Sequence, residues 1–226
     1  MKVMVLAAGK GTRMLPLTAT TPKPLLRAGG LSLIEHQLLK LRSAGFTDVV
    51  INHAWLGTQL EAALGDGARY GISIRWSPEP EPLETAGGIA QALPLLGDQP
   101  FAVVNADIWT DFPFVTLRAA ALGSDLVHLV LVPNPSHHPR GDFSLLGGGR
   151  LALPDPMTGT WTYSGIGVFS PALFAGLPAG KHPLLPLLQQ AIAAGRASAR
   201  HHGGIWLDVG TPERLTWLDQ HLEQRL

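Results

Sequence analysis

The sequence predicts an α/β fold of the Rossmann-like type, a three-layer α/β/α arrangement with a central sheet between helices. Short apolar runs that suit strands buried on both faces alternate with amphipathic helical segments through the first half of the chain. This β-α-β order predicts parallel neighbouring strands with helices on both sides. Alternating strands and a Gly-rich hairpin follow in the second half. We therefore expect a mixed, mainly parallel sheet with a small β-rich annex.

Three strand–helix pairs and a fourth strand are predicted in the first half. Strands are expected over 3–7, 49–51, 72–76 and 101–104, and helices over 32–44, 58–65 and 86–93. Ser32 and Glu35 have the spacing of a capping box, which satisfies free N–H groups at the start of a helix. Gly45 suits the left-handed residue that ends this helix. Thr58 and Glu61 repeat the capping-box spacing and predict the start of the next helix.

The second half has a different pattern. Strands are expected over 126–132 and 161–169, a hairpin from 143–146 and 151–153, and helices over 184–194 and from Thr211 onward. Pro, His and Gly make residues 134–142 an irregular loop. Pro212 is placed at the first position of the last helix, where its missing N–H costs nothing. Residues 1–226 are expected to form one domain, with halves 1–133 and 134–226.

The composition excludes several classes of protein. The chain has 226 residues, 46% of them hydrophobic, with 17 Lys and Arg against 17 Asp and Glu. A protein with zero net charge lacks the strongly positive surface that binds nucleic acid or an anionic membrane. The absence of Cys excludes disulfides, Cys-ligated metals and a thiol nucleophile. We see neither a signal-peptide pattern nor a transmembrane run of about 18 apolar residues, so a cytoplasmic location is expected.

A Gly-rich loop, Leu6–Arg13, directly follows the first strand. The carboxyl end of a strand is the ligand-binding edge of an open α/β sheet. Gly9 and Gly11 let the backbone approach an anion closely, and Arg13 adds positive charge. The loop is not a Walker A motif, because Gly11 stands where Ser or Thr is needed, and Met14 replaces the third Gly of a dinucleotide fingerprint. A flexible, solvated turn is the alternative.

A Lys between two prolines, Pro22-Lys23-Pro24, lies close downstream and cannot occupy an ordinary helix. Together with the Gly-rich loop, this segment resembles the signature of the sugar-1-phosphate nucleotidyltransferases. Residues 81–87 look like the base-side loop of that family. Residues 105–107 look like its metal site, and residues 206–211 look like its second metal motif.

The resemblance implies transfer of a nucleoside monophosphate from a nucleoside triphosphate to a sugar 1-phosphate, with release of pyrophosphate. Arg13 and Lys23 are the implied catalytic residues. The implied nucleotide-binding residues are Ala8, Gly9, Gly11, Thr12, Arg13, Lys23, Glu79, Thr85 and Gly87. The implied sugar-binding residues are Asn105, Gly141, Asp142, Ser164 and Gly165. Asp107 and Asp208 are the implied ligands of Mg²⁺, and the halves 1–133 and 134–226 would bind nucleotide and sugar respectively.

The chemistry of such a reaction agrees with the residue types present. A phosphate monoester is already anionic near pH 7, because its second pKa is about 6, so no general base is required. Catalysis then depends on positioning and on neutralising charge. Two carboxylates suit Mg²⁺, which takes its remaining ligands from phosphate and water. Taken alone, Asp107 is better explained as a turn cap and Asp208 as a residue leading into a helix.

The substrates are less well defined by the sequence. Residues 51–57, 105–111 and 134–143 look like the N-acetylmuramate-1-phosphate uridylyltransferases of peptidoglycan recycling, which implies UTP and N-acetyl-α-muramate 1-phosphate. Mannose-1-phosphate guanylyltransferases have a loop similar to residues 81–87, but typically with Gly at the position of Glu84. They remain an alternative, as does another hexose-1-phosphate nucleotidyltransferase.

No Lys lies between Lys40 and Lys181 to hold the acceptor phosphate, so Arg140 or the metal is expected to do so. The His pairs at 137–138 and 201–202 are expected to be solvated or partly packed rather than a metal site. Trp109 is the best candidate among the Trp residues for a platform under the sugar.

Two non-enzyme alternatives stay open: a regulatory relative that binds a nucleotide-sugar, and a small-molecule binding module on the same fold. The oligomeric state is also open, between a monomer and a small homo-oligomer.

Overall fold

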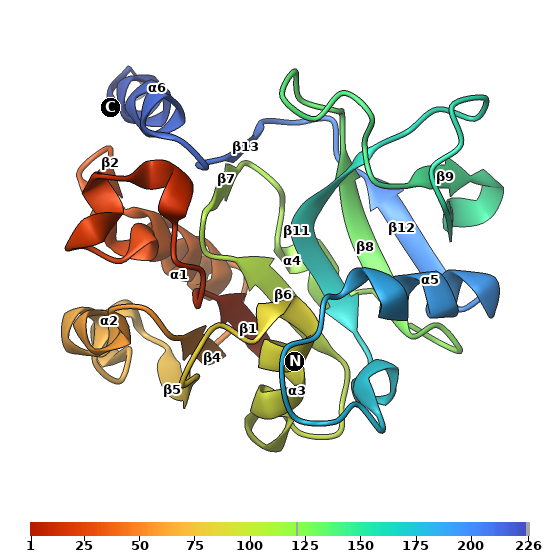
Figure 1. The fold of residues 1–226 in the computed structure, drawn as a ribbon, viewed down its shortest axis with the longest axis horizontal. Helices are drawn as coiled ribbons and strands as arrows, with labels where there is room; N and C mark the ends of the chain where they lie inside the picture. The colour runs from red at the N-terminus through yellow and green to blue at the C-terminus, as the bar shows by residue number, and fades with distance from the viewer. Residues whose placement is uncertain (121, 225–226) are drawn as a thin grey trace.

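The computed structural model describes residues 1–120 and 122–224, and a nine-stranded sheet forms the centre of the fold (Figure 1). The strand order is β5 (Ser73–Pro78), β4 (Asp48–His53), β1 (Val3–Leu6), β6 (Phe101–Asn105), β11 (Thr162–Phe169), β8 (Val127–Val132), β12 (Ala197–His201), β10 (Arg150–Ala152) and β9 (Ser144–Leu146). Strands β10 and β11 run opposite to the other seven. The predicted mixed, mainly parallel sheet is confirmed.

Helices cover both faces of this sheet. α1 (Leu33–Ser43) and α2 (Gly57–Leu64) pack on one face, and α3 (Glu84–Leu96) and α5 (Leu185–Ala193) on the other. Side chains of a strand alternate between the two cores: Val3 and Val5 join the first, and Met4 joins the second. Since β1 is apolar on both faces, it must be covered on both sides. The predicted three-layer arrangement is confirmed.

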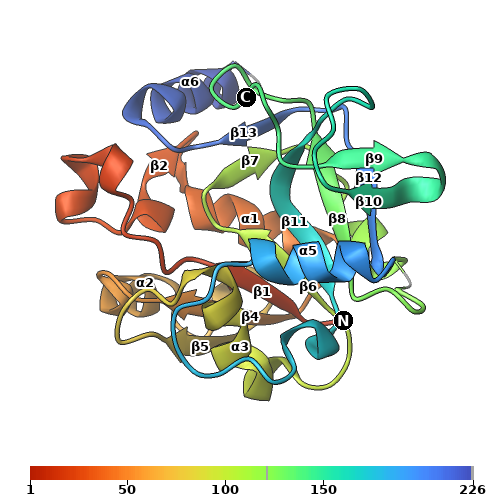
Figure 2. The same ribbon diagram turned by 45° about the vertical axis from the view of Figure 1, so that its right-hand side comes forward.

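The halves of the chain share one sheet. Strand β11, from the second half, lies between β6 and β8 of the first half. The β9–β10 hairpin, predicted as part of an annex, extends one edge of the main sheet (Figure 2). A two-stranded ribbon also joins β7 (Ile108–Thr110) to β13 (Trp206–Asp208). Residue 133 therefore divides the sequence without dividing the sheet.

The first predicted helix start is confirmed and the second is wrong. Ser32 N–H donates to Glu35 Oε2 over 2.9 Å, and Glu35 N–H donates to Ser32 Oγ over 3.4 Å, which completes the capping box of α1. Helix α2 instead begins at Gly57, one residue before the predicted Thr58 cap. The carboxylate of Glu61 lies 2.6 Å from His53 Nε2 and does not return to the helix start.

Short elements are absent from the prediction. They include the ribbon β2 (Arg27–Ala28) with β3 (Leu31–Ser32), the helix α4 (Val115–Arg118), strands β7, β12 and β13, and the 3-10 turns Thr12–Met14, Leu17–Ala19 and Lys23–Leu25. Most of these span two to four residues, too few to show a hydrophobic period. No helix among the described residues is both long enough and apolar enough to cross a membrane.

The last helix, α6 (Pro212–Glu223), closes a third core above β7 and β13 (Figure 2). Trp109 belongs to this core and is 5% exposed, with its ring 5.6 Å from that of His221. The prediction of Trp109 as a platform under a sugar is therefore wrong, because its side chain points into the protein.

Candidate active site

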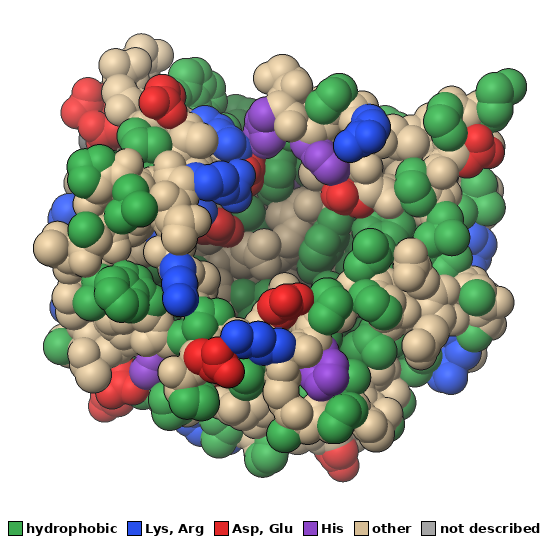
Figure 3. Space-filling model, viewed as in Figure 1, with side chains coloured by type: hydrophobic (Ala, Val, Ile, Leu, Met, Phe, Trp, Pro, Cys, Tyr) green, Lys and Arg blue, Asp and Glu red, His purple; other side chains and the backbone are tan. Residues whose placement is uncertain are grey.

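The face of the molecule in Figure 3 is hollowed at its centre, and Lys, Arg and His side chains gather along the upper edge of the hollow. Two adjoining cavities occupy this region and share Asn105 and Asp107. The first cavity has a volume of about 220 Å³ and lies at the carboxyl ends of β1, β4 and β6. The second has a volume of about 350 Å³ and lies beyond β6, toward β11 and β13. This is the edge where α/β sheets bind ligands.

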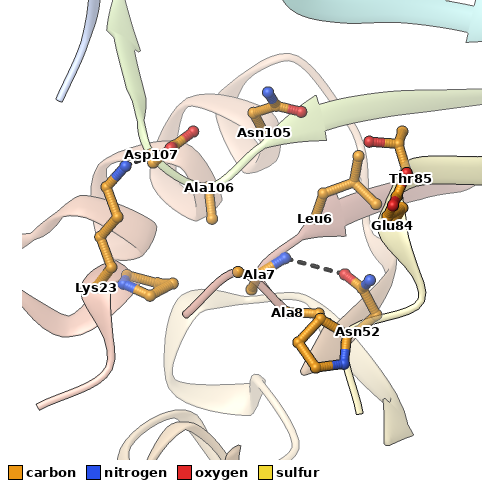
Figure 4. A pocket seen from close by; sticks show the side chains of 13 residues that line it. Leu6, Ala7, Ala8, Lys23, Asn52, Glu84, Thr85, Asn105, Ala106 and Asp107 are labelled. Atoms are coloured by element: carbon orange, nitrogen blue, oxygen red, sulfur yellow. Dashed lines mark hydrogen bonds and ion pairs between the residues drawn. The ribbon is translucent and has the colours of Figure 1, made fainter. Parts of the chain in front are cut away.

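The first cavity brings together most of the predicted nucleotide-binding segments. Its lining residues are Leu6, Ala7, Ala8, Gly9, Lys23, Pro24, Asn52, Pro82, Glu84, Thr85, Asn105, Ala106 and Asp107. Lys23 and Asp107 lie at one end, and Glu84 and Thr85 lie at the other (Figure 4). The cavity therefore has a charged end that can hold phosphate and a far end formed by the predicted base-side loop.

Lys23 is held at the charged end by its surroundings. Its Nζ lies 2.5 Å from Asp107 Oδ2, and the residue is 8% exposed. Gly11, with φ +64, supports it from behind: a Cβ there would lie 3.1 Å from Lys23 Cβ and 3.0 Å from Thr18 Cγ2. Thr18 Oγ1 also donates to the Gly11 carbonyl over 2.8 Å. Gly11 thus shapes the loop, whereas Ala8 and Gly9 face the cavity; Thr12 is not among the lining residues.

Glu79, predicted to contact the nucleotide, lies behind the cavity wall. It is 5% exposed, and its Oε1 accepts a hydrogen bond from Asn52 Nδ2 over 2.6 Å while its Oε2 accepts one from Leu83 N–H over 2.9 Å. Asn52 Oδ1 in turn accepts from Ala7 N–H over 2.9 Å. Burial raises the pKa of Glu79, and the hydrogen bonds from Leu83 and Asn52 oppose that rise. This chain of bonds joins the Gly-rich loop to the base-side loop.

Glu79→Gln is expected to lower the free energy of unfolding by about 1–3 kcal/mol. The backbone N–H groups of Ala7 and Leu83 fix the two ends of the chain of bonds. Glu79 must therefore accept two hydrogen bonds, one on each carboxylate oxygen. A glutamine amide must turn its NH₂ toward either Asn52 Nδ2 or Leu83 N–H, which leaves buried donors facing each other. Urea unfolding measures the change, and Glu81→Gln, at an exposed position, should stay within about 0.5 kcal/mol of the parent protein. Equal stability of the Glu79→Gln variant and the parent protein would contradict the role given to this chain of bonds.

The base-side loop is held against residues 180–182. Gly87 N–H donates to His182 O over 3.2 Å, and a Cβ at Gly87 would lie 2.2 Å from Gly180 O. Gly87 is therefore required for packing against this segment, and it is not among the residues that line the first cavity. Thr85 does face the first cavity, as predicted.

The second cavity joins residues that are far apart in the sequence. Its lining residues are Arg13, Asn105, Asp107, Ile108, Pro135, His137, His138, Thr162, Tyr163, Ser164, Gly165, Trp206 and Asp208. The β7–β13 ribbon brings the predicted metal ligands together, because Asp208 pairs with Ile108 and Val209 N–H donates to Asp107 O over 2.8 Å. Asp208, at the end of β13, thus lies beside Asp107, in the turn before β7, and both line one cavity.

Two residues beside Asp208 were missed by the sequence analysis. Arg214, in the first turn of α6, forms an ion pair with Asp208 Oδ1, and His137 Nε2 lies 3.0 Å from the same oxygen. Arg13 is close by, since a Cβ at Gly210 would lie 3.3 Å from Arg13 Nη1 and 3.2 Å from Arg214 Nη2. His137 was expected to be solvated or partly packed, whereas the structure gives it a carboxylate partner. The ribbon supplies that partner from a distant part of the chain.

The predicted sugar-binding residues divide into two groups. The second cavity is lined by Asn105, Ser164 and Gly165. Gly165 has φ +77, and a Cβ there would lie only 2.6 Å from Asn105 Nδ2, so a glycine leaves the room that the Asn105 side chain needs. Asp142 instead supports the wall: its Oδ2 accepts from Tyr163 N–H over 2.8 Å and its Oδ1 lies 2.9 Å from His138 Nε2.

Gly141 is also structural. It has φ +61, and a Cβ there would lie 2.6 Å from Asn134 Oδ1. Asn134 in turn donates from Nδ2 to Thr160 Oγ1 over 2.9 Å. Gly141 thus allows the 134–142 loop to turn back beside Asp142.

The donor set of Asp107 and Asp208 fits Mg²⁺. Both ligands are carboxylates, and a pair of acids is the usual protein contribution when phosphate and water complete the coordination. Asp208 Oδ1 is buried and, within residues 1–120 and 122–224, accepts no well-aligned hydrogen bond although Arg214 and His137 lie beside it. The described residues contain no group of three or more acidic or His side chains placed to hold a metal by themselves.

Comparison with known proteins agrees with this geometry. The family model described as "Nucleotidyl transferase" matches residues 2–141. The chain belongs to the nucleotidyl transferase family. The predicted family resemblance is thereby confirmed, and the matched segment contains every residue that lines the first cavity.

Relatives of this nucleotidyl transferase match it over nearly its whole length. It is 53% identical to N-acetylmuramate alpha-1-phosphate uridylyltransferase of Neisseria meningitidis, over 95% of both chains. It is 34% identical to the protein of the same name from Caulobacter vibrioides, over 93% of this chain and 92% of the other. A mannose-1-phosphate guanyltransferase of Aspergillus fumigatus is 31% identical over 94% of this chain and 62% of its own length.

A solved structure shows the same fold. A candidate glucose-1-phosphate thymidylyltransferase from Bacillus anthracis, in complex with sucrose, superposes with a TM-score of 0.86 over 98% of this chain and 95% of the other. At 19% identity this likeness concerns the fold, and it agrees with the predicted nucleotidyltransferase architecture.

Proposed function

We propose that this chain transfers a uridylyl group from UTP to N-acetyl-α-muramate 1-phosphate, giving UDP-N-acetylmuramate and pyrophosphate. The observation that carries the proposal is the 53% identity, over 95% of both chains, to a relative that bears the name of this activity. Two cavities that meet at Asn105 and Asp107 support it, because the reaction needs two substrates held side by side.

The nucleotide occupies the first cavity, with its phosphates toward Lys23 and its base toward Thr85. This cavity is lined by residues 6–107 alone, so the half 1–133 binds nucleotide. The sugar occupies the second cavity, beside Asn105, Ser164 and Gly165, with its 1-phosphate toward Asp107. The half 134–226 supplies a wall of that cavity and shares it with residues of the first half.

In the reaction, an oxygen of the sugar phosphate forms a bond to the α-phosphorus of UTP. The bond from that phosphorus to the bridging oxygen of the β-phosphate breaks, and its electron pair leaves with pyrophosphate. The attacking oxygen is already anionic near neutral pH, so no proton has to be removed. Lys23 and Arg13 stabilise the negative charge that shifts between phosphates.

Asp107 and Asp208 would hold Mg²⁺, which supplies positive charge to the phosphate groups when bound. Arg214 and His137 both contact Oδ1 of Asp208 and hold its carboxylate in place. Arg13 lines the second cavity, whereas Arg140 is not among its lining residues. We therefore propose that Arg13 and the metal site at Asp107 and Asp208 hold the acceptor phosphate, and that Arg140 does not.

Transfer of a guanylyl group to mannose 1-phosphate is the second candidate, because a mannose-1-phosphate guanyltransferase is 31% identical over 94% of this chain. The two candidate functions are distinguished by testing four nucleoside triphosphates with several sugar 1-phosphates and measuring pyrophosphate release for each pair. We expect the highest kcat/KM with UTP and N-acetylmuramate 1-phosphate. A clear preference for GTP with mannose 1-phosphate would contradict the proposal. Mg²⁺-dependent binding without turnover of any pair would favour the non-enzyme alternatives.

A further inference from the structure

Glu84 has a backbone conformation that its residue type disfavours. It follows Leu83 at the start of α3 and has φ +60, in the left-handed region. A side chain with a Cβ is strained there, whereas Gly is not. The surrounding bonds hold the conformation in place: Leu83 N–H is bound by Glu79, and Ala86 N–H donates to His182 O over 3.0 Å. Strain of this kind in a cavity wall points to a functional role of the side chain.

The side chain of Glu84 has no structural role that would explain it. It is exposed, lines the first cavity and forms no hydrogen bond or ion pair with the residues described in the structure. The nearby Lys181 is engaged by Glu81, with 2.6 Å between Nζ and Oε2. A favourable effect on the helix dipole needs only an acid in the first turn and does not require a left-handed backbone.

The position of Glu84 in the cavity indicates which part of a nucleotide it meets. Figure 4 shows Glu84 beside Thr85, at the end opposite Lys23 and Asp107. With the phosphates at the Lys23 end, the base is the part that extends toward Glu84. The carboxylate is an acceptor without a hydrogen to donate. It therefore favours a ring that presents an N–H and disfavours a ring that presents a lone pair.

We propose that the Glu84 carboxylate accepts a hydrogen bond from the ring N–H of the base and so selects uracil over cytosine. Uracil carries a hydrogen on N3, whereas cytosine has an unprotonated, electron-rich N3 at the same place. This inference rests on the proposed function, since it assumes that a pyrimidine nucleotide occupies the first cavity. The proposal thus assigns selection of the base to the side chain of Glu84.

Equilibrium binding of UTP and CTP, measured by calorimetry with Mg²⁺ and without acceptor, tests the proposal in Glu84→Gly and Glu84→Gln. Gly suits the left-handed backbone, so the melting temperature of Glu84→Gly should stay near that of the parent protein. An unchanged melting temperature excludes a folding defect as the cause of any loss of binding. Glu223→Gln, at an exposed position on α6, is the matched control.

We expect Glu84→Gly to weaken UTP binding about tenfold to hundredfold, the effect of losing a charge-assisted hydrogen bond. CTP binding should stay the same or become tighter, because the carboxylate no longer faces the lone pair on cytosine N3. Glu84→Gln should also reduce the difference in binding affinity between UTP and CTP. An equal loss for both nucleotides would overturn the proposal in favour of a ribose contact, and full retention of selectivity would overturn it outright. Pyrophosphate release by the parent protein tests the proposed function separately, because the binding comparison needs no turnover.

Discussion

Replacement of Lys23 with Met is expected to lower kcat/KM for UTP by at least about a hundredfold, the scale seen when a preorganised electrostatic contact to the reacting group is removed. Lys23 is 8% exposed, so its charge acts on the phosphates through a medium that screens it weakly. Met retains the apolar stem that packs beside Gly11 but removes the cation. Steady-state pyrophosphate release with the preferred acceptor gives the number.

The control for this prediction is Lys2→Gln. Lys2 donates from Nζ to Leu95 O over 2.8 Å, and it precedes β1, whereas the cavities lie at the other end of that strand. Its replacement removes a cation of the same type without touching either cavity. Normal kcat/KM in Lys23→Met, or an equal loss in both variants, would refute the role of Lys23.

Asp208→Asn is expected to reduce kcat by at least about a hundredfold and to raise the Mg²⁺ concentration needed for half-maximal rate. An amide is a weaker ligand for a hard cation than a carboxylate, and it leaves Arg214 without its ion pair. The fold should persist, because β13 is held to β7 by backbone hydrogen bonds. Titration with Mg²⁺ gives the activity effect, and Mn²⁺ binding followed by paramagnetic resonance gives metal affinity without turnover.

Asp98→Asn is the matched control for Asp208→Asn. Asp98 is exposed and contacts Gln99 at the far end of the sheet from both cavities. Its replacement should leave both the Mg²⁺ requirement and Mn²⁺ binding at parent values. Unchanged Mn²⁺ affinity in Asp208→Asn would remove Asp208 from the metal site, whatever the effect on rate.

The regular part of the fold could be predicted because its causes are local. Strand β1 is a short run that is apolar on both faces, and α1 begins at a capping box, Ser32 with Glu35. The second cap, at Thr58, failed because side-chain contacts with the end of β4 decided the start of this helix: Glu61 lies 2.6 Å from His53 Nε2, and a Cβ at Gly57 would lie 1.8 Å from His53 Nδ1. Spacing alone carries no information about those contacts.

The candidate site shows the same division. Lys23, Asp107 and Asp208 were predicted from motifs, and the structure places them at the two adjoining cavities. Arg214 and the Asn52–Glu79 hydrogen bond escaped prediction, because both depend on side-chain contacts that the spacing of residues does not reveal. The three-residue ribbon strands that bring Asp208 to Asp107 are too short for a periodic signal.

A single labelling experiment tests the central claim that the two cavities carry out uridylyl transfer at Asp107 and Asp208. UTP labelled at the α-phosphate is incubated with N-acetylmuramate 1-phosphate and Mg²⁺, and the products are separated. We predict that the label appears in UDP-N-acetylmuramate, that pyrophosphate is unlabelled, and that Asp208→Asn suppresses both products together. Label recovered in UMP, or in a nucleotide-sugar formed equally well by Asp208→Asn, would contradict the claim.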